Sequence, residues 1–123
     1  MSKIKTASEA VRLISDGATV AVNSSSGLLC PDAVLKALGE RFLAEGAPKN
    51  LTMIHPIAAG DMFGTKGVDH IAHKGMITRI IGGSYPSGPT NAEPPLIWQR
   101  ILAEDLAAWN IPSGILFDML REG

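Results

Sequence analysis

The chain has 123 residues, of which 46% are hydrophobic and 19% are charged, and its formal net charge is −1. This composition is typical of a globular domain rather than a disordered chain, and the near-neutral charge gives no reason to expect nucleic acid or a membrane surface as a partner. No apolar run is long enough to span a bilayer, the N-terminus lacks the apolar core of a signal peptide, and the single cysteine permits no internal disulfide. We therefore expect one cytoplasmic domain over residues 1–123.

The first predicted elements are a helix and a strand. Residues 6–9 (TASE) match a capping box, Val11 and Ile14 continue at helical spacing, and Gly17 is a natural helix end. Residues 18–22 then form a short continuous apolar run. Such a run predicts a strand buried on both faces, as in a parallel sheet.

Helices and strands alternate along the rest of the chain. Apolar residues at helical spacing predict a helix over residues 32–45, which Gly46 ends. The further predicted elements are a strand over 51–55, a helix over 68–74, a buried strand over 77–81, a helix over 96–104, a strand over 109–111 and a helix over 113–120. This alternation predicts an α/β fold with an open, mainly parallel sheet and helices on both faces. Because no closing strand follows the last helix, we expect part of a larger domain.

A small polar loop follows the first predicted strand and consists of Asn23, Ser24, Ser25, Ser26 and Gly27. Ligands in open α/β sheets bind outside the carboxyl ends of the strands, so we interpret this loop as the floor of a binding site for a carboxylate or an oxyanion. The alternative is an ordinary loop that leads into the next helix. A serine nucleophile is disfavoured, because none of the three serines has the glycine two residues earlier that a nucleophile elbow needs.

A second candidate loop contains Gly60 and Asp61, followed by Gly64 and Gly67. It has no Gly-Lys-Ser/Thr sequence and is therefore not a phosphate-binding loop of the Walker type. The loop either lies beside an acyl pocket or is a crossover whose glycines adopt positive φ angles.

Three further candidates have structural alternatives that we favour. His70 and His73 are spaced to share a helix face, but no third ligand follows at a convincing distance, which favours packed or surface imidazoles over a metal site. Cys30 lies near a helix N-terminus, where a thiol pKa is lowered, yet no base accompanies it, so we interpret it as a small packing residue. Trp98 and Trp109 are interpreted as core or interface anchors.

Four segments, in this order and spacing, resemble the N-terminal (α) half of the family I coenzyme A-transferases, the acetate/propionate and 3-ketoacid group. They are residues 41–50 (RFLAEGAPKN), 69–75 (DHIAHKG), 79–83 (RIIGG) and 109–114 (WNIPSG), and the resemblance covers nearly the whole chain.

The chain departs from the family pattern at several polar positions. The first loop reads Asn23-Ser24-Ser25 where the family carries Gly-Gly-Phe or Ser-Gly-Phe, and Leu29 replaces a glycine of that loop. Ala59 and Ser113 stand where the family commonly has glutamine. Substrate choice therefore does not follow from the resemblance.

The resemblance implies an acyl-CoA:carboxylate CoA-transferase. In such enzymes a glutamate of the C-terminal (β) half attacks the thioester and becomes a glutamyl-CoA thioester through an anhydride. This chain would then contain no catalytic residue and no metal, and would be inactive alone. The acyl- and carboxylate-binding side would come from Asn23, Ser24, Ser25, Ser26, Gly27, Gly60 and Asp61.

The same resemblance implies the ligands and partners. Coenzyme A would enter as a thioester substrate, with no permanently bound cofactor, and the β half would complete a homo- or hetero-oligomer. The glutamates of this chain are interpreted as structural: Glu9 in a cap, Glu40, Glu45 and Glu104 on helices, Glu93 before two prolines, and Glu122 at the end.

Two alternatives remain open. The altered loop and the missing glutamines also fit a domain of the same fold that senses a small carboxylated or phosphorylated metabolite without turnover. A degenerate, purely structural subunit that depends on a catalytic β chain is the other alternative.

Overall fold

A four-stranded sheet organises the computed structural model, which describes residues 3–61, 67–86 and 93–123. The strands lie in the order β1-β2-β3-β4, and each neighbouring pair is parallel. Their bounds are Thr19–Ala21 for β1, Leu51–His55 for β2, Ile77–Gly82 for β3 and Ala107–Asn110 for β4. The predicted α/β class with an open parallel sheet is confirmed.

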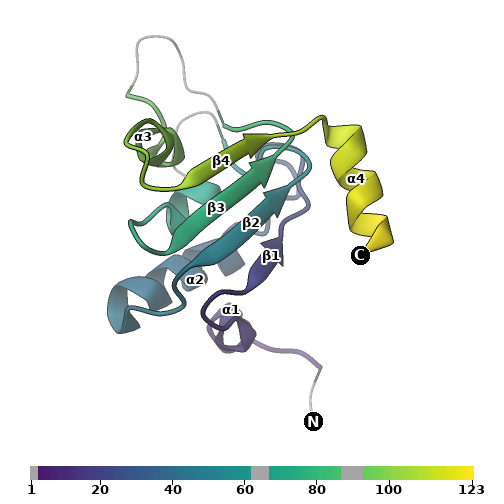
Figure 1. Cartoon of the computed structure of the whole chain (residues 1–123). Coiled ribbons are helices and arrows are strands. Elements are labelled where there is room, and N and C mark those ends of the chain that lie inside the picture. Colours follow the sequence, from purple (N-terminus) through teal and green to yellow (C-terminus); the bar gives the residue numbers. More distant parts are fainter. Residues whose placement is uncertain (1–2, 62–66, 87–92) are drawn as a thin grey trace.

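Helices precede β1, connect the strands and follow β4 (Figure 1). They are α1 (Ala7–Ala10), the 3₁₀ helix η1 (Val11–Leu13), α2 (Asp32–Glu45), the 3₁₀ helix η2 (Val68–Ile71), α3 (Leu96–Leu102) and α4 (Ser113–Glu122). In Figure 1, α2 and η2 lie behind the sheet, and α3 packs against η2. Helix α4 follows β4 and lies to the right of the sheet in this view. No helix in the described part of the chain has the length and apolar character needed to cross a membrane.

Several predicted features agree with the structure. The bounds of α2 and β2 match the predicted helix over 32–45 and strand over 51–55, and Gly46 ends α2 in the left-handed region with φ +68°. The capping box is present, because the Thr6 hydroxyl accepts from the Glu9 N–H and the Glu9 carboxylate accepts from the Thr6 N–H.

Three predicted helices are shorter than expected. The first changes to a 3₁₀ turn at Val11, and Gly17 (φ +73°) lies in the turn into β1. The helix predicted over 68–74 is only the four-residue η2, and α3 ends at Leu102. Glu104 therefore lies beyond α3, with φ +55°, and its predicted place on a helix is wrong. Strand β4 begins earlier than the predicted 109–111, at Ala107.

The hydrophobic core lies between the sheet and the helices behind it. In-register residues Val20, Met53, Ile80 and Ala108 share this face of the sheet, since neighbours in a parallel ladder point to the same side. The fully buried members packed there include Leu38 of α2, Leu51, Met53, Ile71 of η2, Ile80 and Ile97 of α3.

Helix coverage of the two faces is unequal. Thr19 and Ala21 of β1 are exposed, as are Arg79 of β3 and every residue of β4. The prediction that the first strand is buried on both faces is therefore wrong within the described residues. The physical reason is topological: right-handed crossovers between strands laid down in sequence order place their helices on one face.

A buried carboxylate joins η2 to α3. The Asp69 side chain accepts hydrogen bonds from the Leu96 N–H at 2.6 Å and the Ile97 N–H at 3.0 Å, and so satisfies free donors at the start of α3. Burial raises the pKa of Asp69, and these two hydrogen bonds oppose that shift.

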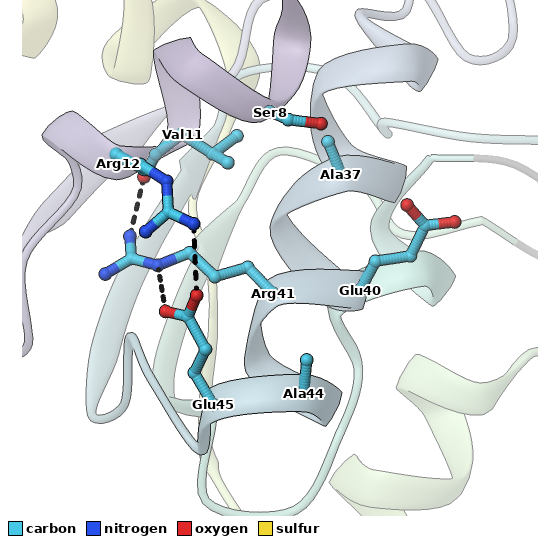
Figure 2. A pocket seen from close by; sticks show the side chains of 8 residues that line it. All are labelled: Ser8, Val11, Arg12, Ala37, Glu40, Arg41, Ala44 and Glu45. Atoms are coloured by element: carbon cyan, nitrogen blue, oxygen red, sulfur yellow. Dashed lines mark hydrogen bonds and ion pairs between the residues drawn. The ribbon is translucent and has the colours of Figure 1, made fainter.

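Arg41 of α2 joins the first turns of the chain to the core helix (Figure 2). Its Nη1 donates to the Val11 carbonyl at 2.7 Å and to the Ile14 carbonyl at 2.9 Å, while its Nε donates to Glu45 at 3.2 Å. Arg12 reaches the same Glu45 carboxylate at 3.3 Å. The Arg41 side chain is 17% exposed, whereas that of Arg12 is 67% exposed.

We expect Arg41→Met to lower the free energy of unfolding by about 2 kcal/mol, because two backbone carbonyls lose a charged donor. Arg12→Met should change it by less than about 0.5 kcal/mol, as is usual for an exposed ion pair. Urea denaturation of both variants measures the difference. Equal losses would contradict the assigned role of Arg41.

His55 ends β2 inside the core. Its side chain is fully buried, and neither ring nitrogen has a hydrogen-bond partner among the described residues. Burial lowers the pKa of His55 to about 4, since a charged imidazolium would be desolvated there.

The buried histidine makes the stability depend on pH. The unfolded chain protonates His55 near pH 6.5 and the folded chain only near pH 4, so stability should fall by up to about 3 kcal/mol as the pH drops through this window. His55→Phe should remove that part of the slope, whereas His73→Gln should keep it. Denaturation curves at pH 7 and pH 4 test this, and an unchanged slope in His55→Phe would overturn it.

Candidate active site

Loops from three strands meet at the carboxyl edge of the sheet. After β1, the Ser26 carbonyl accepts from the Gly60 N–H of the β2 loop at 3.2 Å, and the buried Ser24 hydroxyl donates to the Ala58 carbonyl at 3.1 Å. The Ala58 N–H in turn donates to Ser84 Oγ, after β3, at 3.0 Å. The predicted floor loop and the glycine-rich loop are therefore joined directly.

A cavity of about 150 Å³ lies between these loops. Three of the predicted site residues border it, namely Ser26, Gly60 and Asp61. The complete lining is Ser26, Ala58, Gly60, Asp61, Ser84, Tyr85 and Pro86. Its walls thus combine serine hydroxyls and one carboxylate with apolar surface.

The other predicted site residues lie outside this cavity. Asn23, Ser25 and Gly27 are exposed to solvent, whereas Ser24 is buried and braces the loop through its bond to Ala58. Gly64 falls outside the described residues. Ser84 and Tyr85 were missed by sequence reasoning, although their position directly after β3 was the available signal.

The floor loop and the segment directly after it hold two non-glycine residues in the left-handed region. Ser26 has φ +54° and Leu29 has φ +57°. Ser26 lies inside a tight turn in which Ser25 and Leu28 exchange backbone hydrogen bonds at 2.9 and 3.0 Å. Since such conformations are costly for residues with a Cβ and cluster at ligand-binding loops, they mark this loop as a candidate functional segment.

Gly67, at the end of the glycine-rich loop, pairs with Gly60 next to the cavity. Its N–H donates to Asp32 Oδ1 at 2.8 Å, and its φ is +77°. A Cβ at this position would run into the backbone of Ala59 and Gly60. Gly60, with φ +134°, and Gly67 both adopt the positive φ angles that the crossover alternative expected.

Asp32 is a positioning residue that the sequence did not single out. Besides Gly67, its Oδ1 contacts His70 Nε2 at 3.0 Å, so the first residue of α2 holds both the glycine-rich loop and η2. His73 instead stacks on Phe42, with ring centroids 5.9 Å apart. The two histidines are thus engaged separately, and no cluster of three potential metal ligands occurs among the described residues.

The pKa of the Cys30 thiol is shifted in the direction opposite to the one that its place in the sequence suggested. Burial and the nearby carboxylates of Asp32 and Asp61 raise its pKa, whereas proximity to a helix N-terminus predicted a lower one. Cys30 packs against the hydrophobic core, as the structural interpretation expected.

A second cavity, of about 210 Å³, lies between α1, η1 and α2 (Figure 2). Its charged lining includes Arg12, Arg41 and Glu45, whose side chains pair with one another. It adjoins the half of α2 that leads into the amino end of β2, away from the joined loops. We assign this cluster a structural role.

Gly67→Ala should destabilise the chain by about 3 kcal/mol or more, because both the backbone conformation and the contact with Ala59 and Gly60 forbid a side chain. Gly17→Ala is the matched control: Gly17 has a similar φ of +73°, but a Cβ there meets nothing within 4 Å. Its cost should be about 1 kcal/mol. Similar losses in thermal or urea unfolding would show that the close approach is unimportant.

The chain has clear relatives among enzymes of known class. It is 30% identical over 121 residues to acetate CoA-transferase YdiF of Escherichia coli K12, a match covering 96% of this chain and 21% of that protein. It is 29% identical over 126 residues to caffeate CoA-transferase of Acetobacterium woodii, covering 99% of this chain and 22% of that protein. No protein-family model matches the chain.

Solved structures show the same relationship. The YdiF apoenzyme of Escherichia coli O157:H7 has a TM-score of 0.82 at 26% identity, over 96% of this chain and 22% of that one. The thioester complex of the same enzyme with CoA also has a TM-score of 0.82 at 26% identity, over 95% of this chain and 23% of that one. The chain therefore spans about a fifth of the length of these relatives. Its sequence and its fold together show that the chain is homologous to part of these CoA-transferases.

Proposed function

We propose that this chain supplies the acyl- and carboxylate-binding side of a CoA-transferase active site. The observation that carries the proposal is the cavity at the carboxyl edge of the sheet, bordered by Ser26, Gly60 and Asp61. It lies where ligands bind in open α/β sheets, in a chain homologous to CoA-transferases. The nucleophile comes from the rest of the enzyme.

The reaction is covalent catalysis by a carboxylate. A glutamate attacks the acyl carbonyl of acyl-CoA, the C–S bond breaks, and CoA leaves as a thiolate while an acyl-glutamyl anhydride forms. The thiolate then attacks the glutamyl carbonyl, which releases the first acid and leaves a glutamyl-CoA thioester. A second acid reverses these steps and leaves as its CoA ester. Donors around the cavity stabilise the oxyanions.

Size restricts what the cavity can hold. Its volume of about 150 Å³ suits a short acyl group and is too small for the nucleotide part of CoA.

The test is CoA transfer from acetyl-CoA to a panel of short carboxylic acids, measured in the complete enzyme that contains this chain. We expect transfer to at least one acid, together with a CoA adduct on a glutamate outside residues 1–123 that mass spectrometry detects. The 123-residue chain by itself should be inactive. Absence of both transfer and adduct would refute the proposal, and acid binding without an adduct would indicate the metabolite-sensing alternative.

A matched pair of serine variants tests the role of the cavity. Ser84→Ala removes a hydroxyl that lines the cavity and holds the Ala58 N–H, so it should raise KM for the acid about fivefold, which corresponds to one lost hydrogen bond. Ser25→Ala, at an exposed position outside the cavity, should leave KM unchanged. Equal effects would place the acid elsewhere.

A further inference from the structure

Tyr85 has the largest side chain among the described residues that border the cavity at the carboxyl edge of the sheet. The other described lining residues are two serines, an alanine, a glycine, an aspartate and a proline, none of which carries a side chain as large as a phenol ring. Truncation of those residues would add little space, whereas truncation of Tyr85 would add most of the volume of its ring. The size of the cavity is therefore set mainly at this one position.

The ring of Tyr85 is held by two contacts. Its hydroxyl donates a hydrogen bond to the Trp109 carbonyl of β4 at 2.5 Å. Its ring meets Trp98 of α3 edge to face, with ring centroids 5.5 Å apart and an angle of 63° between the planes. Burial raises the pKa of Tyr85, so the hydroxyl keeps the proton that it donates. Rotation of the ring out of its place would break both contacts.

Neighbouring residues attach the same wall to the sheet and to α3. The ring lies so close to β3 that a Cβ at Gly82 would come within 3.1 Å of its Cζ atom. The Trp98 indole N–H donates to the carbonyl of Pro86, the lining residue that follows Tyr85, at 2.5 Å. The wall formed by Tyr85 and Pro86 is thus fixed to β3, β4 and α3 together.

We propose that Tyr85 determines the acyl-chain length that the cavity accepts, admitting short acids such as propionate and excluding longer ones such as hexanoate. The proposal rests on the proposed function, since it requires the acyl group to occupy this cavity. A longer chain fits only if the ring leaves its contacts with Trp109 and Trp98. Each methylene group that an apolar pocket accepts or rejects changes kcat/KM by about tenfold or more.

Competition between propionate and hexanoate measures this preference. The complete enzyme receives acetyl-CoA and equal concentrations of the two acids, and the ratio of propionyl-CoA to hexanoyl-CoA formed gives the ratio of their kcat/KM values. The parent enzyme should form mainly propionyl-CoA. Tyr85→Ala should shift the ratio towards hexanoyl-CoA by about tenfold or more, because the space of the ring becomes available to the chain. An unchanged ratio in Tyr85→Ala would overturn the proposal.

Two milder substitutions at Tyr85 provide the test if Tyr85→Ala does not fold. Tyr85→Leu has a smaller apolar side chain and should shift the ratio in the same direction by a smaller factor. Tyr85→Phe keeps the ring and its contact with Trp98, so it should change the ratio by less than about twofold. A larger shift in Tyr85→Phe than in Tyr85→Leu would show that the volume of the ring does not set the preference.

Phe42→Ala is the matched control for loss of an aromatic ring. Phe42 stacks on His73 and does not line the cavity. Its truncation should therefore leave the product ratio unchanged. Equal shifts in Phe42→Ala and Tyr85→Ala would attribute the effect to loosened packing and would overturn the role of Tyr85.

Calorimetric titration with hexanoate separates this proposal from the proposed function, because it requires no transfer of CoA. Hexanoate that binds Tyr85→Ala about tenfold more tightly than the parent, with no transfer by either enzyme, would support the chain-length role and refute only the CoA-transferase function. Transfer that Ser84→Ala weakens, together with an unchanged product ratio in Tyr85→Ala, would refute only the role of Tyr85.

Discussion

Parallel pairing of four strands in sequence order is the constraint on which the rest of this structure depends. Right-handed crossovers then carry α2, η2 and α3 to one face, while the segments that follow the strands all emerge at one edge. One topological fact therefore accounts for both the buried core behind the sheet and the loops that meet at its carboxyl end. It also leaves the opposite face without helices from these connections.

Backbone contacts and short polar side chains together fix the geometry of the joined loops. Gly60 and Ser26 are linked through main-chain atoms, and Gly67 fits only because it lacks a Cβ. Asp32 then ties Gly67 and His70 to the first turn of α2.

The structure shows the conformation and burial of two residues that depart from the family pattern, Leu29 and Ala59. Leu29 occupies a position where the resembled family has glycine, and it adopts φ +57°, a conformation that glycine adopts without strain. Leucine at this position therefore carries backbone strain that glycine would not, and its side chain is 90% exposed. Similarly, Ala59, which stands in place of glutamine, is buried and bonded through its backbone to Val68.

Local patterns in the sequence were enough for the long helix over 32–45, the strand over 51–55 and the capping box at Thr6, because these depend on periodicity and on contacts between near neighbours. They also predicted that Ser26, Gly60 and Asp61 lie at the carboxyl edge of the sheet, since loops that follow parallel strands all emerge at that edge. Only the tertiary structure decided that β1 has an exposed face, that η2 stops at Ile71, and that Ser84 and Tyr85 complete the cavity wall. These features depend on which segments distant in the sequence pack together, and no local pattern of residues encodes such contacts.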